Sequence, residues 1–366
     1  MQALIYRADR APLAGADLSG PHQIYRRPRL AVESRADEVL PAGHVRVDVR
    51  LAGVCGSDVN LMQCDPASGY ILGSVPFDVG PEGRILGHEA VGQVREVGAG
   101  VAGLDRGAWV ALESLRVCQR CDACRRGLFN QCAHAVLVGM QADGYFREVV
   151  DVPLQLVHDV SDLAASDGGR RAAACLEPAA CSFGALTRAR VAPGDRVLIF
   201  GAGPIGAFAA LLARAAFGAA SVCVVEPLPA RRELARRWAD RVCDLDEAIA
   251  DVAPVDVLVE CSGDLANVDR AATRMAPNGR IVLLARHGAP LTVRAVDHLI
   301  TNQVSILGAR GHLGGSMSDV LRLERAGRVR LAEAVTGVVD GLDALRGALE
   351  TPAELTRTQC KLLVRL

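Results

Sequence analysis

Residues 197–206 read VLIFGAGPIG, an apolar run that leads into closely spaced glycines and then into an alanine-rich segment of helical pattern. The turn comprises Gly201, Gly203, Pro204, Ile205 and Gly206. Between a strand and a helix, the first glycine permits a tight turn, the second lets the backbone approach a pyrophosphate, and the third lets the helix pack on the strand. The spacing therefore predicts a dinucleotide-binding turn, and a glycine turn without a ligand is the alternative.

An acidic residue follows this turn at the distance typical of dinucleotide-binding units. Glu226 ends the next apolar run, SVCVVE, about twenty residues beyond the glycines. A carboxylate at this point accepts hydrogen bonds from the adenosine ribose and repels a 2′-phosphate, which favours NAD over NADP. Arg231 and Arg232 lie just beyond, and an arginine within reach would accept that phosphate instead. NAD is the predicted cofactor, NADP is the alternative, and Arg231 is a further candidate for cofactor binding.

The pattern on either side of the turn predicts two domains. From residue 194 onward, apolar strand-like runs alternate with amphipathic helix-like segments, as in a parallel sheet covered on both faces. Between about residues 31 and 160, short strand-like runs are broken by Gly and Pro turns, which indicates a β-rich, barrel-like module. We expect an α/β fold with a doubly wound parallel sheet in residues 181–311. A β-rich domain of residues 1–180 is expected to be completed by residues 312–366, whose final KLLVRL resembles a returning strand.

Composition limits the classes of partner. The 366 residues include 41 basic and 42 acidic side chains, so the chain is nearly neutral and gives no electrostatic reason to bind nucleic acid or a membrane surface. A small molecule is the expected partner. The N-terminal segment lacks the apolar core of a secretory signal, and a cytoplasmic location is expected. The only lysine is Lys361, and its surroundings in the sequence fit no lysine-dependent chemistry.

Four cysteines gather in the stretch CQRCDACRRGLFNQC. They are Cys118, Cys121, Cys124 and Cys132. Thiolates at this spacing hold a metal, form disulfides or carry out redox chemistry. A reducing cytosol disfavours disulfides, and four thiolates would close the coordination shell of a structural zinc.

Three other segments carry the ligand types of a catalytic zinc. Cys55 lies in VCGSDVN, His88 and Glu89 in LGHEAVG, and Glu177 in CLEPAAC. One thiolate, one imidazole and one carboxylate would leave a fourth position open for a substrate. Each residue also has a structural interpretation, as a core cysteine, a hydrogen-bonded histidine or a helix start.

These segments resemble a known family. The run Gly87-His88-Glu89, with Gly92, Gly98 and Val101 at fixed offsets, is similar to the signature of the zinc-dependent medium-chain alcohol and polyol dehydrogenases. VCGSD, the four-cysteine segment, LEP and the glycine turn occur in that family's order, so the resemblance covers essentially the whole chain. It implies a GroES-like catalytic domain, with a structural-zinc lobe at residues 116–134, and a Rossmann domain.

The resemblance also implies roles for individual residues. Cys55 and His88 correspond to ligands of the catalytic zinc, with Glu177 as the third ligand and Glu89 as its substitute. Asp58 corresponds to a carboxylate that orients the ligand histidine, and Ser57 to the hydroxyl that passes on the substrate proton. The four cysteines would hold the structural zinc, which gives two zinc ions per chain.

The implied activity is hydride transfer between a secondary alcohol and NAD, giving the ketone, with a polyol, cyclitol or amino-sugar alcohol as substrate. The alternatives are a threonine or simple alcohol dehydrogenase, and an epimerase or lyase that oxidises its substrate transiently. The resemblance further implies a homodimer or homotetramer.

Several positions depart from the family's pattern or leave its details open. Asn60 stands where many relatives have a histidine that completes the proton relay, and an amide cannot take up a proton. The long segment 64–83 is either a specificity element or a surface insertion. Candidate substrate or nicotinamide binders are Arg286, His287, Arg310 and His312.

Overall fold

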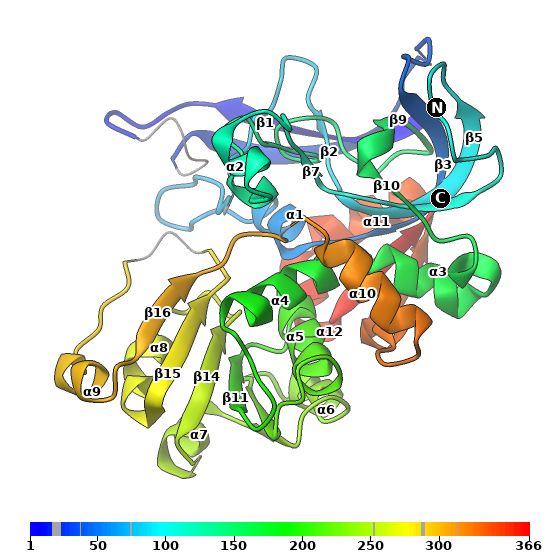
Figure 1. The fold of residues 1–366 in the computed structure, drawn as a ribbon. Coiled ribbons are helices and arrows are strands. Elements are labelled where there is room, and N and C mark those ends of the chain that lie inside the picture. The colour runs from blue at the N-terminus through cyan, green and yellow to red at the C-terminus, as the bar shows by residue number, and fades with distance from the viewer. Residues whose placement is uncertain (17–22, 37, 74, 252, 287–289, 313) are drawn as a thin grey trace. The chain divides into compact units, whose positions relative to one another are not determined.

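The computed structural model describes residues 1–16, 23–36, 38–73, 75–251, 253–286, 290–312 and 314–366. The described chain forms two compact units (Figure 1). The first comprises Met1–Glu177, Leu331–Leu355 and Lys361–Leu366, and the second comprises Pro178–Arg330 and Thr356–Cys360. His287 lies outside the described residues.

The first unit is rich in β-structure, as its short alternating runs predict. Its strands are β1 (Gln2–Arg10), β2 (Tyr25–Ser34), β3 (His44–Gly53), β4 (Arg84–Ile85), β5 (Glu89–Val97), β6 (Trp109–Leu112), β7 (Leu115–Arg116), β8 (Val136–Leu137), β9 (Val149–Pro153), β10 (Val157–Asp159), β17 (Val335–Asp340) and β18 (Lys361–Arg365). Its helices are α1 (Gly56–Leu61), α2 (Asp122–Arg125), α3 (Asp167–Ala174) and α11 (Gly341–Glu350), with short 3-10 turns η1 (Phe129–Gln131), η2 (Leu154–Leu156), η3 (Leu163–Ala165) and η5 (Leu331–Ala334). Two further helices, α4 (Leu176–Arg188) and α12 (Pro352–Thr358), cross from one unit into the other along the chain.

The main sheet of this unit has the order β10-β6-β5-β3-β18-β17, and β9 also pairs with β3. A second sheet has the order β2-β1-β4, and β7 pairs with β8. β3 alternates buried valines with polar residues (Val45, Val47, Val49), so one face of the strand packs into the core. The C-terminal β18 runs antiparallel to β3, which confirms that the last residues return to the first module.

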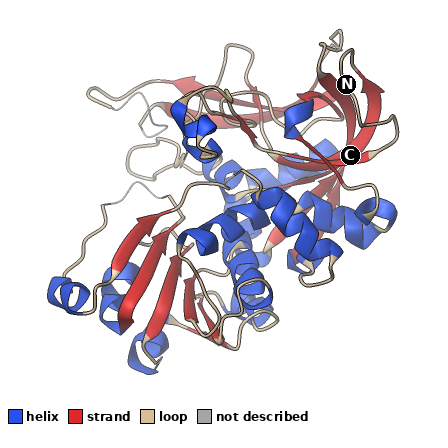
Figure 2. Ribbon diagram, viewed as in Figure 1, coloured by secondary structure: helices blue, strands red, loops and turns tan. Residues whose placement is uncertain are grey.

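The second unit contains the predicted parallel sheet. Its strands are β11 (Arg196–Phe200), β12 (Ser221–Val225), β13 (Arg241–Cys243), β14 (Val255–Glu260), β15 (Met275–Leu283) and β16 (Ser305–Gly308). They are all parallel, in the order β13-β12-β11-β14-β15-β16, which is that of the dinucleotide-binding doubly wound fold. The helices, blue beside the red strands in Figure 2, are α5 (Pro204–Ala215), α6 (Pro229–Ala235), α7 (Leu245–Asp251), α8 (Ala266–Ala271), α9 (Val296–Thr301) and α10 (Ser316–Arg325), with the 3-10 turn η4 (Ala272–Arg274). The predicted fold class is thus confirmed.

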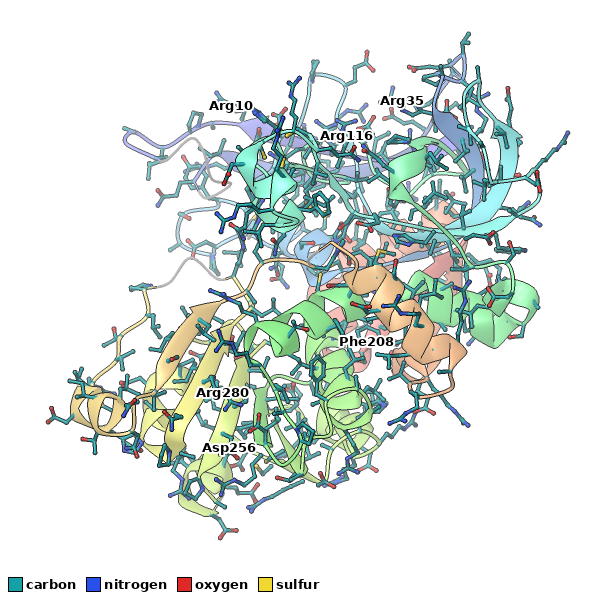
Figure 3. All side chains as sticks on the ribbon, viewed as in Figure 1. Arg10, Arg35, Arg116, Phe208, Asp256 and Arg280 are labelled. Carbon is teal, nitrogen blue, oxygen red and sulfur yellow. The ribbon has the colours of Figure 1, made fainter. Side chains whose placement is uncertain are left out.

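Charged residues connect the strands of this sheet at their amino ends, away from the glycine turn. Arg196, the first residue of β11, donates from its backbone and its guanidinium to Asp256 on β14, at 2.8 and 2.9 Å. Arg280 on β15 pairs with Asp195 (Figure 3 labels Asp256 and Arg280). Phe208 on α5, also labelled, is fully buried. The glycine turn follows the carboxyl end of β11, and ligands of such sheets bind at the carboxyl ends of the strands.

The division of the chain differs from the expected one near the C-terminus. We expected residues 312–366 to complete the β-rich domain, but the second unit continues to Arg330 and so includes α10. The Arg328 guanidinium donates to the carbonyl of Ala215, the last residue of α5, at 3.2 Å. The return to the first unit therefore begins at Leu331, whose turn packs against α3.

Candidate active site

Strand pairing brings Cys55, His88 and Glu89 together in the first unit. β3 and β5 are antiparallel, with Gly53 opposite Glu89, so the residues that follow β3 lie beside those that begin β5. A thiolate, an imidazole nitrogen and a carboxylate oxygen from the three side chains lie within 4.8 Å of one another. His88 and Glu89 are buried, and Cys55 is partly exposed. The arrangement has the donor types of a catalytic zinc site and a route to solvent through Cys55.

Asp58 holds the two halves of this cluster in place. Its carboxylate accepts the backbone N–H of Cys55 at 3.0 Å and that of Gly87 at 3.3 Å. The side chain is completely buried, and burial raises its pKa, while the charge of His88 and both backbone donors lower it. One carboxylate thus connects the segments that carry Cys55 and His88, and its role in orienting the His88 side chain stays a prediction.

His88 has the features expected of a metal ligand. Burial by itself lowers its pKa, but the neighbouring Cys55 and then Asp58 raise the pKa well above its usual value. Its Nδ1 atom is buried and has no hydrogen-bond partner among the described residues. A zinc ion binds sulfur and nitrogen donors, so a buried imidazole nitrogen beside a thiol fits such an ion. The positive charge of the zinc would take the place of the proton that the imidazole otherwise holds.

The two candidate carboxylates, Glu177 and Glu89, differ in their positions relative to Cys55 and His88. Glu177 is nearly buried and accepts a hydrogen bond from the Ser114 hydroxyl at 2.6 Å. It is near enough for its charge to raise the pKa of His88, but among the described residues the cluster within 4.8 Å contains Glu89 and not Glu177. Glu177 as third ligand, with Glu89 as substitute, stays a prediction.

Ser57 lies in the first turn of α1, two residues after Cys55. Its Oγ atom is buried and has no hydrogen-bond partner within the part of the chain that the structure describes. A hydroxyl in this state is available to a substrate. Asn60 lies on the same short helix.

Sequence reasoning did not identify Lys361 as a member of this site. Its ammonium group is completely buried, forms an ion pair with Glu89 and donates to the carbonyl of Val54 at 2.8 Å. The only feature of the sequence that could have indicated this role is the position of Lys361 at the start of a strand that returns to the β-rich module.

The four-cysteine segment forms a second cluster in the first unit. The ligand atoms of Cys118, Cys121, Cys124 and Cys132 lie within 4.8 Å of one another, and all four are free thiols. The Sγ atom of Cys132 lies 3.5 Å from that of Cys118 and 3.9 Å from that of Cys121. Zn–S bonds of about 2.3 Å in a tetrahedron would place sulfurs about 3.8 Å apart, so the cluster has the dimensions of a zinc site.

Backbone groups around these cysteines favour thiolates. The N–H groups of Cys118 and His134 point at the Cys132 sulfur, and that of Cys121 at the Cys118 sulfur, each at 3.4 Å. Backbone donation from Cys124 and from Ala133 lowers the pKa of Cys121 to about 6. Metal binding requires deprotonated sulfur, so these backbone donors, which stabilise the thiolate form, favour the binding of a metal cation.

The glycine turn of the second unit has the backbone that a pyrophosphate site needs. Gly201 has a positive φ of 93°, Gly203 precedes α5, and Pro204 is the first residue of that helix. The Glu226 carboxylate accepts the backbone N–H groups of Ala202 at 2.8 Å and of Leu228 at 3.0 Å. A carboxylate has further lone pairs for ribose hydroxyls.

Arg231 on α6 also lies beside the turn, since a Cβ atom added at Gly203 would be 3.8 Å from its Nη1 atom. Arg286 and Arg310 belong to the same unit; burial, and then the charge of Arg310, lower the pKa of Arg286.

Replacing Gly206 with alanine is expected to weaken NADH binding at least about tenfold, because the added Cβ would overlap the carbonyl oxygen of Gly201 and displace the turn. Gly347→Ala on α11 is the matched control, since an added Cβ there meets no atom of the described residues within 4 Å. Titration of NADH fluorescence measures both. Equal affinities for the two variants would contradict a nucleotide at this turn.

No helix among the described residues is both long and apolar enough to cross a membrane.

Comparison with known proteins supports these assignments at the level of the family. Residues 41–162 match the alcohol dehydrogenase GroES-like domain, and residues 204–324 match the zinc-binding dehydrogenase domain. The chain is 30% identical to L-threonine 3-dehydrogenase of Pyrococcus horikoshii over 84% of its own length and 87% of that protein. It is 34% identical to L-galactonate-5-dehydrogenase of Escherichia coli over 72% and 73% of the two chains.

Among solved structures, a protein from Thermotoga maritima superimposes with a TM-score of 0.89 at 24% identity, with both chains fully covered. This likeness concerns the fold alone. Matching domains in both units, and relatives that match over most of their length, show that the chain belongs to the zinc-dependent medium-chain dehydrogenase family.

Proposed function

We propose that the protein is an NAD-dependent zinc dehydrogenase that oxidises a secondary alcohol of the polyol, cyclitol or amino-sugar alcohol class to the ketone. The observation that carries the proposal is the cluster of Cys55, His88 and Glu89, held together by Asp58, in a chain that also has the glycine turn and Glu226. A second zinc, held by the four cysteines, would order the lobe and leave no open position for a substrate.

Each residue of the site has a separate role in the proposed reaction. Zinc held by Cys55 and His88 with a carboxylate would act as a Lewis acid on the alcohol oxygen, while NAD would accept the hydride. Asp58 keeps the two ligand segments in register. Ser57, whose hydroxyl is buried and unpartnered among the described residues, would accept the substrate proton. Asn60 cannot take that proton further, so water or another histidine would carry it to solvent.

The substrate class rests on analogy with the relatives. Their names concern L-threonine and L-galactonate, which are polar molecules with secondary hydroxyl groups. Because one fold supports many substrates, this analogy gives a class and not a compound. We also propose a homodimer or homotetramer, a prediction that size-exclusion chromatography with light scattering would test.

A screen of polyols, cyclitols and amino alcohols for NADH formation tests the proposed function. Steady production of NADH with at least one of these alcohols is the expected result. Turnover of substrate without net NADH would instead support the epimerase or lyase alternative, in which the cofactor is regenerated in place. Failure of all secondary alcohols, with zinc and NADH bound, would contradict the proposal.

Cofactor preference is expected to depend on Glu226. Replacing Glu226 with glutamine removes the negative charge that repels a 2′-phosphate, and Arg231 beside the turn remains to attract it. The ratio of kcat/KM for NAD to that for NADP should fall about tenfold, which is about 1.4 kcal/mol. Glu233→Gln, the same change at an exposed residue of α6, should leave the ratio unchanged. A variant at Glu226 with an unaltered ratio would contradict its contact with the ribose.

A further inference from the structure

Lys361 occupies an unusual position for the only lysine of the chain. It is the first residue of β18, and its side chain and that of Glu89 both have 0% exposure. Three neighbouring strands place the two residues on either side of Gly53, since Gly53 is opposite Glu89 on β5 and opposite Leu363 on β18. A buried ammonium group beside a candidate metal site requires a reason, because burial of a charge is costly unless the charge is paired.

Gly53 provides the space in which the pair meets. A Cβ atom at this position would overlap Glu89 Oε2 and would lie 2.9 Å from Cε and 3.0 Å from Nζ of Lys361. The backbone of Gly53 does not have a positive φ, so no conformational demand explains the glycine. The absent side chain instead lets a carboxylate and an ammonium group from the two flanking strands reach one another across β3.

The two carboxylates near Cys55 and His88 have different partners. Glu177 is held by the neutral hydroxyl of Ser114, whereas Glu89 is held by the cationic Lys361. A lysine ammonium and a divalent cation compete for the same oxygen lone pairs, because both interact with a carboxylate through its negative charge. An oxygen in a close ion pair with Lys361 is therefore less available to a metal.

Charge balance predicts the effect of removing the lysine. Cys55, Asp58, Glu89 and Glu177 would all be anionic around a divalent metal, and Lys361 is the one permanent side-chain cation that the described ion pairs place among them. Without Lys361, the buried Glu89 carboxylate would have the metal as its nearest positive partner. Since Glu89 already has an oxygen within 4.8 Å of the donor atoms of Cys55 and His88, a small rotation would let it bind.

We propose that Lys361 is a positioning residue: its ion pair with Glu89 withholds this carboxylate from the catalytic metal and so leaves a coordination position for the substrate. The inference rests on the proposed function, because it requires a metal at Cys55 and His88. Lys361 acts only through Glu89 and contacts neither substrate nor cofactor in this proposal.

Replacing Lys361 with methionine tests this role, with Co²⁺ added to protein whose four-cysteine lobe retains zinc. Zinc is spectroscopically silent, so the visible bands report the Cys55 site alone. The expected result in Lys361→Met is a fifth ligand, seen as weaker d–d bands, and an affinity for Co²⁺ raised about tenfold or more, in the range by which outer residues alter metal sites. Lys361→Arg keeps the cation and should retain the wild-type spectrum.

A double variant separates ligation by Glu89 from the simple loss of a nearby positive charge. In Glu89→Gln/Lys361→Met, the cation is absent but position 89 has no carboxylate to supply a fifth ligand, so the bands should return to wild-type intensity. Persistence of the weakened bands in the double variant would overturn the proposal. This variant also buries neither charge, and therefore remains usable if Lys361→Met alone does not fold.

The affinity of the double variant gives an independent readout, because the double variant removes Glu89 together with the cation that would otherwise stay unpaired beside the metal. If Lys361 withholds Glu89 from the metal, the affinity of Glu89→Gln/Lys361→Met for Co²⁺ should stay within about threefold of the wild type. A loss of tenfold or more would show that Glu89 is already a ligand and would overturn the proposal. If wild-type protein binds no Co²⁺ outside the lobe, the proposed function itself fails. Normal binding with an unchanged Lys361→Met spectrum would reject only the role of Lys361.

Discussion

Replacing Cys55 with alanine is expected to lower kcat/KM by about 1,000-fold or more and to reduce the zinc content from about two ions per chain to about one. The size of the effect follows from the contribution of a Lewis acid, several kcal/mol, with each 1.4 kcal/mol equivalent to a factor of about ten in rate. The thiolate is also the most strongly zinc-preferring donor of the cluster, and His88 with a carboxylate would hold the metal weakly.

Steady-state kinetics and metal analysis measure these two expected changes, and thermal unfolding shows whether the variant retains its fold. Cys64→Ala is the matched control, since Cys64 is a partly buried free thiol outside both cysteine-containing clusters. It should retain both zinc ions and nearly full activity. Retention of both ions by the Cys55 variant would contradict the placement of the catalytic metal, whereas loss of both would show that the change disturbs the fold.

Replacing Cys124 with serine is expected to empty the four-cysteine lobe and to leave the Cys55 site loaded. Cys124 is buried and supplies one of the four sulfur atoms of the cluster, so its removal leaves the coordination shell incomplete. The lobe has only the short helix α2 and a 3-10 turn. Since metal binding supplies the folding free energy of such segments, we expect the lobe to unfold locally and the melting temperature to fall by roughly 5–10 °C.

Limited proteolysis can detect this unfolding directly. The lobe contains Arg120, Arg125 and Arg126, and trypsin should cleave after them at least about tenfold faster in the variant, because cleavage follows the population of the open segment. The kcat of the surviving enzyme should change little. Equal cleavage rates for wild type and variant would indicate that the lobe is ordered without metal, and Cys64→Ser controls for the loss of a thiol.

Features encoded within a short stretch were predictable from the sequence. The glycine turn, the following Glu226 and the alternation of strands and helices led to the correct parallel sheet, because each signal lies within a single strand-turn-helix unit. The four cysteines within fifteen residues similarly form one cluster, since a short loop cannot place its ligands far apart.

Features that depend on pairing between distant strands were harder to predict. No local spacing connects Cys55 with His88, and only the family resemblance suggested that they meet. The proximity of Glu89, rather than Glu177, to this pair follows from the register of β3 on β5. Lys361 was overlooked because its partner Val54 is 307 positions away in sequence. The assignment of α10 to the second unit depends on long-range contacts, such as that of Arg328 with Ala215, that no periodicity reveals.

The return of β18 to β3 has a consequence for dissecting the protein into fragments. A fragment of residues 1–177 would contain Cys55, His88, Glu89 and the whole lobe. It would lack the strand that pairs with residues 51–53 of β3, and the ammonium group that neutralises Glu89. Such a fragment would expose an unpaired strand edge next to a buried, uncompensated carboxylate, and both favour aggregation or misfolding. Residues 178–330, in contrast, are contiguous and contain the entire parallel sheet. The nucleotide-binding unit is therefore the one to express alone, and the catalytic unit requires a linker that joins residue 177 to residue 331 in place of the excised domain.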